Sequence, residues 1–223
     1  LRYLDYYNSR THFSGHVVAL AGYDEEAGVA YLADTQFAGL QEEPLGNLAK
    51  ARSSRAYPFP VHHDCYPVPR PGALAPFEKA ISRALASNAR WMIESEHPCG
   101  LVALEAAARD VPNWAKDLEG DAWRWAARFT YQVIERRGTG GAAFRRLYYD
   151  FLVEGGEYVP ALKADRFLHP LDEARNAWHQ AAEAFRRASE TDEAAYLEEA
   201  ARRLLRVHAR ETVFWRTVAK EFS

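Results

Sequence analysis

The pattern of apolar and polar positions changes character near residue 72. Before that point, short apolar runs alternate with turn residues. Ser14 to Gly22 and Val29 to Ala33 are two such runs, and the turn-forming stretch Asp24 to Gly28 separates them. Two short runs rich in small and β-branched residues, joined by a turn, are typical of a β-hairpin. We expect a short helix over Leu45 to Ser53 after the hairpin. An extended edge segment over Tyr57 to His63 should follow, because its prolines cannot donate to a central ladder.

The period after residue 72 is helical, because apolar residues recur every three or four positions. The stripes are Phe77, Ile81, Leu85, Ala89 and Met92; Phe144, Leu147, Phe151 and Leu152; Leu171, Ala174, Trp178, Ala181 and Phe185; and Leu197, Ala201, Leu204, His208 and Trp215. We expect roughly six helices on one core. The predicted fold class is therefore α+β, with a strand-containing region over residues 1–71 and an all-helical domain over residues 72–223.

The composition argues against three classes of protein: nucleic-acid binders, membrane-spanning proteins and disulfide-stabilised scaffolds. The chain has 223 residues, with 28 Lys and Arg against 31 Asp and Glu, so it lacks the basic excess of a nucleic-acid binder. No apolar run approaches the roughly 20 residues that span a membrane. Two cysteines make no disulfide scaffold and fit a reducing cytoplasm. The chain begins at Leu1 without a methionine, and we expect an upstream segment to be absent from it.

The hairpin predicts a histidine–carboxylate pair. Reflecting His16 through the turn, whose centre lies near residues 25–26, places it opposite about residue 35, next to Asp34. Opposed residues on neighbouring strands share a face, with Cβ atoms ~5 Å apart. Asp34 could accept the Nδ1 proton of His16 and leave Nε2 as a base for a nucleophile. Spacing alone also allows a half-buried pair with a structural role only.

The residues themselves do not supply an obvious nucleophile. Cys65 follows two histidines and an aspartate in the string HHDC, but neighbouring side chains on an extended segment point to opposite faces. That string also lacks the spacing of a metal site, and we expect no bound metal. Cys99 follows a proline and should open a helix, as a stabilised thiolate or as an inert buried thiol.

Further candidates concern binding. Gly138 to Gly141 precede a helix that starts with two arginines, so Gly140, Gly141 and Arg145 could hold a phosphate, such as that of phosphopantetheine or coenzyme A. A glycine-rich helix start with solvated arginines is the alternative. Tyr7 and His12 lie near His16 in sequence and could line a pocket or simply pack on the strands.

Several strings resemble a known family. HFSGHVVALAGYD (12–24), VAYLADT (29–35) and LAKARSS (48–54) resemble the later part of the N-terminal domain of butirosin biosynthesis protein H, which belongs with the papain-like cysteine enzymes. GTGGAAFRRLYYDFL (138–152), the helix around Trp178 and HARETVFW (208–215) resemble the helical domain that accompanies it. The resemblance spans nearly the whole chain.

The resemblance implies acyl transfer. A cysteine would take an acyl group from an acyl carrier protein, and a small-molecule amine would then attack the acyl-enzyme in natural-product biosynthesis. His16 and Asp34 would be the base and the orienting acid, and the cysteine would lie upstream of Leu1. Phosphopantetheine would serve as the donor's arm, with no further cofactor. The sequence leaves the oligomeric state open, with a homodimer as one possibility. The alternatives are a papain-like peptidase, amidase or thioesterase, in which water replaces the amine, and a non-catalytic binding relative.

Overall fold

The computed structural model describes residues 1, 16–35, 37–55, 60–68, 72–96, 99–191 and 193–222. The chain divides into two compact units, Leu1–Gly72 and Ala73–Ser223. The α+β class predicted from the sequence is confirmed, because the first unit holds a small antiparallel sheet and the second is helical.

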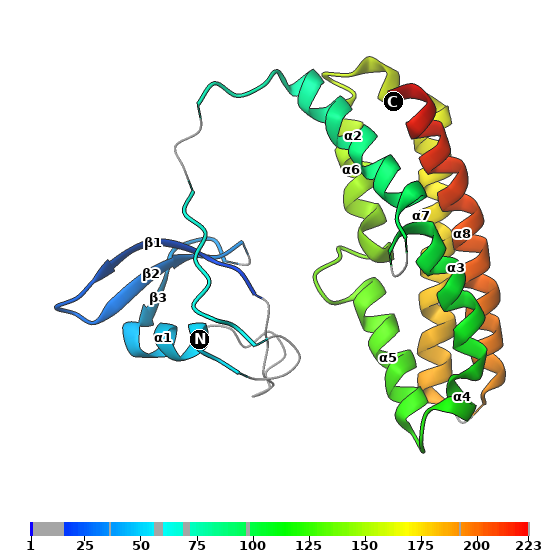
Figure 1. Cartoon of the computed structure of the whole chain (residues 1–223), viewed down its shortest axis with the longest axis horizontal. Coiled ribbons are helices and arrows are strands. Elements are labelled where there is room, and N and C mark those ends of the chain that lie inside the picture. Colours follow the sequence, from blue (N-terminus) through cyan, green and yellow to red (C-terminus); the bar gives the residue numbers. More distant parts are fainter. Residues whose placement is uncertain are drawn as a thin grey trace. The chain divides into compact units, whose positions relative to one another are not determined.

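The first unit is built on a three-stranded sheet in the order β1-β2-β3 (Figure 1). Strand β1 (Ala19–Asp24) pairs antiparallel with β2 (Val29–Ala33), which pairs antiparallel with β3 (Gln41–Pro44). Helix α1 (Leu45–Arg52) follows β3 directly. Ala30 and Leu32 alternate inward from β2 and are buried. The predicted hairpin and the helix after it are thus confirmed, although β1 begins at Ala19 and not at Ser14.

The predicted edge strand was wrong. Residues 60–63 form no strand, and the third strand is β3 instead, which its sequence QEEP gave no reason to expect. The amides of Val61 and His63 bond Ser54 and Arg52 at the end of α1, with N···O distances of 2.8 Å each. These hydrogen bonds hold the segment against a helix end and leave the sheet edge to β3.

Among the residues described for the second unit, six α-helices have eleven residues or more, as predicted. The helices are α2 (Phe77–Glu94), α3 (Gly100–Asp110), α5 (Ala122–Glu135), α6 (Arg145–Gly155), α7 (Asp165–Glu190) and α8 (Ala195–Phe222). Shorter elements join them: η1 (Val111–Asn113), α4 (Trp114–Asp117), η2 (Ala142–Phe144) and η3 (Pro160–Lys163). The C-cap of α5 and the turn η2 lie on either side of Gly138 to Gly141, the glycine motif.

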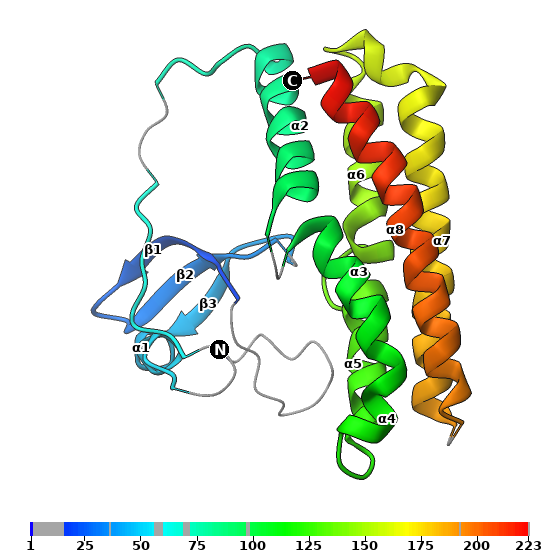
Figure 2. The ribbon, with the colours of Figure 1, turned by 45° about the vertical axis from the view of Figure 1, so that its right-hand side comes forward.

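Helices α7 and α8 form the backbone of this unit and run side by side along its length (Figure 2). Small residues line their contact, including Ala181, Ala188, Ala200 and Ala201, and short side chains let two helices approach closely. Two apolar clusters flank the pair. One joins α5 to the later part of α7, and the other joins α2, α3 and α6 to the end of α8.

One predicted stripe differs from the structure. Phe144 and Leu147 were expected on a buried face, yet their exposed fractions are 54% and 51%. Phe144 belongs to the turn η2 and Leu147 to the first turn of α6, whereas Leu152 of the same stripe is fully buried as expected. Within the described ranges, no helix combines the length and the apolar character needed to cross a membrane.

Candidate functional site

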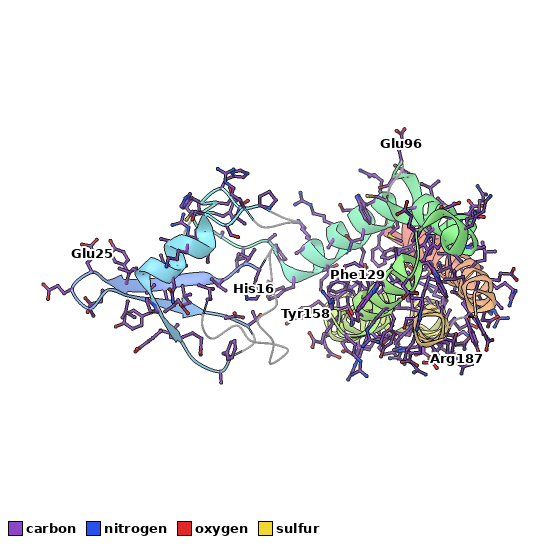
Figure 3. The ribbon with its side chains drawn as sticks, turned by 90° about the horizontal axis from the view of Figure 1, so that it is seen from below. His16, Glu25, Glu96, Phe129, Tyr158 and Arg187 are labelled. Carbon is purple, nitrogen blue, oxygen red and sulfur yellow. The ribbon has the colours of Figure 1, made fainter. Side chains whose placement is uncertain are left out.

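His16 and Asp34 lie at one end of the β1–β2 hairpin, opposite the turn that carries Glu25 (Figure 3). The register pairs Ala19 with Ala33, so His16 precedes the first strand and Asp34 directly follows the second. The sequence placed both residues on strands, whereas the structure places both just beyond them. The predicted contact between them is confirmed.

The pair is short and protected from water on the carboxylate side. His16 Nε2 lies 2.7 Å from Asp34 Oδ2. The Asp34 side chain is 1% exposed and that of His16 is 20% exposed. A buried carboxylate held this close fixes the plane of the ring. The arrangement can therefore orient a base whose other edge reaches solvent or a substrate.

The nitrogen that faces Asp34 differs from the predicted one. We expected Asp34 to bind Nδ1 and leave Nε2 as the base, and the structure reverses these roles. The reason is geometric: His16 lies before the strand and approaches Asp34 diagonally, so the far nitrogen of the ring reaches the carboxylate. Nε2, the atom predicted as the base, is therefore the one that Asp34 engages.

The remaining candidates in the first unit are less informative. Tyr7 and His12 lie outside the described residues. Cys65 is exposed, and Cys99 lies in the other unit, where it is the N-cap residue of α3 as predicted. In the part of the chain that the structure describes, no group of three or more His, Cys, Asp or Glu side chains could hold a metal ion.

A buried carboxylate on β3 was not anticipated. Glu43 is fully buried and lies opposite Ala30 in the register, on the inward face of the sheet. Its Oε1 accepts a hydrogen bond of 2.8 Å from Asn47 Nδ2 in α1. The pair ties α1 to the sheet. The only signal in the sequence was a Glu four residues before an Asn across the strand–helix junction.

The glycine motif forms a left-handed turn. Gly140 and Gly141 have φ values of 69° and 93°, and the three residues of η2 that follow have φ between 49° and 69°. Left-handed backbone costs roughly 1–2 kcal/mol per non-glycine residue. Hydrogen bonds hold the turn: buried Thr139 donates its hydroxyl to Ile134 O at 2.9 Å and accepts from Gly141 N–H at 3.3 Å.

Replacing Gly140 with alanine is expected to destabilise the helical unit by about 2–3 kcal/mol. A Cβ there would lie 2.9 Å from Leu147 Cγ and would also carry the strain of positive φ. Gly138→Ala is the matched control. Its φ is also positive, at 76°, but an added Cβ would meet no atom within 4 Å beyond the adjoining residues, so about 1 kcal/mol should be lost. Urea unfolding measures both. Equal losses would mean that contact with Leu147 is unimportant.

The side chain of Arg145 is not solvated, which contradicts the alternative of a helix start with solvated arginines. Its Nε and Nη2 lie 2.6 Å and 3.1 Å from the two oxygens of Glu211, and its Nη1 donates to Ala143 O at 2.8 Å. Glu211 is 0% exposed and also accepts the indole N–H groups of Trp178 at 2.8 Å and Trp215 at 2.6 Å. A phosphate at Arg145 would have to displace this carboxylate, so the motif's evident task is to join η2 to α7 and α8.

Comparisons with known proteins address mainly the helical unit. A family model described as a domain of unknown function, DUF4872, matches residues 46–218. No curated protein matches the chain. The matched range contains the glycine turn, Arg145 and Glu211, and begins after His16 and Asp34.

Proposed function

The chain belongs to the DUF4872 family, and we propose that the protein is a cysteine-dependent acyltransferase. It would move an acyl group from an acyl carrier protein thioester to an amine in natural-product biosynthesis. The observation that carries the proposal is the 2.7 Å contact between His16 Nε2 and the buried carboxylate of Asp34. The resemblance to the butirosin biosynthesis protein H family supplies the reaction class, and the free thiols fit work in the cytoplasm.

In the first half-reaction, His16 Nδ1 takes the thiol proton of a cysteine from a segment upstream of Leu1. The thiolate attacks the thioester carbonyl of the loaded carrier. Collapse of the tetrahedral intermediate breaks the bond to the phosphopantetheine sulfur, which leaves with the proton from His16. The acyl group is then bonded to the cysteine, and Asp34 has stabilised the imidazolium throughout.

In the second half-reaction, the amine attacks the acyl-cysteine carbonyl. His16 Nδ1 takes the proton that the amine loses and returns it to the departing cysteine sulfur. An amide is formed and the thiol is restored, so neither an oxidant nor a metal is needed. Water in place of the amine would give the free acid by the same steps, which is the chemistry of a hydrolase.

The test uses the natural full-length protein and a carrier loaded with a short acyl chain. Intact-protein mass spectrometry is expected to show one acyl group added to the protein when no amine is present. Adding a panel of amines should discharge it as amide. Release of free acid without any amine would show that the protein acts as a hydrolase and not as a transferase. Absence of both acylation and turnover would leave a non-catalytic carrier-binding relative and overturn the proposal.

A further inference from the structure

A second histidine–carboxylate pair lies in the helical unit, apart from the site described above. His179 on α7 places Nδ1 2.7 Å from Oε1 of Glu135, the last residue of α5. The other carboxylate oxygen lies against Gly141, where an added Cβ would be 3.4 Å from it. Among the described residues, no group bonds His179 Nε2, and the side chain is about half exposed.

His179 also lines a cavity of about 440 Å³ beside the α7–α8 pair. The other lining residues that carry hydrogen-bonding side chains are Gln180, Glu183, Arg187, Tyr196, Glu199 and Arg203. The volume is within the range of small-molecule sites. Arg187, labelled in Figure 3, lies at the surface of the helical unit, so the cavity opens to solvent.

The two carboxylates of the cavity are already engaged. Glu183 accepts from Arg186 Nε and Nη2 and from Arg187 Nε, and these bonds, chiefly those from Arg186, lower its pKa to about 2. Glu199 accepts likewise from Arg202 and then Arg203, which lower its pKa. Both carboxylates are therefore ionised at neutral pH, with most of their lone pairs occupied.

The arginines are engaged on one side only. Arg203 donates hydrogen bonds from Nε to Glu199 and from Nη1 to Gln180, and Arg187 donates one from Nε to Glu183. Within the described ranges, Arg203 Nη2 and both Nη groups of Arg187 have no acceptor. The cavity thus has a surplus of donors. Several fixed donors around one space favour a ligand group rich in acceptor oxygens.

We propose that this cavity binds the phosphate group of a small phosphorylated molecule, with Arg187 and Arg203 as its donors and His179 lining the space beside them. Glu135 acts as a positioning residue, because it holds Nδ1 of His179 and so fixes the imidazole at the cavity. A phosphate offers three acceptor oxygens, which match the Nη groups of the two arginines. A cavity of about 440 Å³ leaves room for an organic group beside the phosphate.

The experiment titrates the full-length protein with inorganic phosphate and, separately, with glycerol 3-phosphate, by calorimetry at fixed ionic strength. Arg203→Gln is expected to weaken binding at least tenfold. The matched control is Arg202→Gln, which removes the same charge from the same Glu199 but does not line the cavity, and it should change affinity less than twofold. Tighter binding of glycerol 3-phosphate than of phosphate would identify the organic part as bound too.

Two further pairs keep the test informative if one variant fails to fold. Arg187→Gln is compared with Arg186→Gln, which pairs with the same Glu183 outside the cavity. His179→Gln is compared with His169→Gln, an exposed histidine earlier on α7 near Glu173. If both variants of each pair lost the same affinity for the probes, the binding would be due to surface charge and not to the cavity. That result, or no binding of either probe, would overturn the proposal.

Discussion

His16→Ala is expected to reduce acylation of the full-length protein by roughly 10²- to 10⁴-fold, which is the usual contribution of a positioned acid–base group. Without the imidazole, no group takes the proton of the nucleophile or returns it to the leaving thiol. The variant should remain folded, because His16 precedes the first residue of β1 and is partly exposed. Mass spectrometry of the acyl-enzyme, taken at several times after mixing with loaded carrier, measures the rate.

The control is His62→Ala, another histidine of the first unit, which is exposed and should leave the rate unchanged. Asp34→Asn separates orientation from charge. It keeps a side chain of the same shape against Nε2 but cannot stabilise an imidazolium, so we expect a smaller loss than for His16→Ala. A normal acylation rate in folded His16→Ala would exclude the mechanism, whatever the effect of Asp34→Asn.

The hairpin shows how far local sequence reasoning extends. The turn symmetry brought His16 and Asp34 together correctly, although a bulge between Leu20 and Gly22 shifts the register by one residue. A shift of one residue changes which residues face each other directly, but it leaves His16 and Asp34 close enough to meet diagonally. Which ring nitrogen meets Asp34 depends on the approach of a side chain beyond the strand end. No repeating pattern in the sequence encodes that approach.

Strand β3 and the Arg145–Glu211 pair were missed for a different reason. Gln41–Pro44 has little intrinsic preference for a strand, and it becomes one because β2 offers a free edge beside it. Arg145 and Glu211 are 66 positions apart. Apolar stripes predicted α6 and α8 as helices but carried no signal that one polar position on each would meet in the core. Both features depend on tertiary pairing, which a single sequence does not reveal.

Glu211→Ala is expected to lower the free energy of unfolding of the helical unit by about 3–5 kcal/mol, the usual loss when one partner of a buried ion pair is removed. The change would leave the Arg145 guanidinium, only 16% exposed, without its counter-charge. It would also leave the indole N–H groups of Trp178 and Trp215 without an acceptor. Arg145 holds Ala143 O as well, so the strained turn η2 should loosen together with the pair.

Glu221→Ala is the matched control, because Glu221 lies on the same helix α8 and pairs with Arg166 at 3.0 Å, but at the surface. An exposed pair contributes about 0–1 kcal/mol, so this variant should unfold at nearly the wild-type urea concentration. Tryptophan fluorescence follows the helical unit selectively, because all six tryptophans lie between residues 91 and 215. Similar losses for the two variants would show that Glu211 acts as an ordinary surface charge and that the four donors around it find other acceptors.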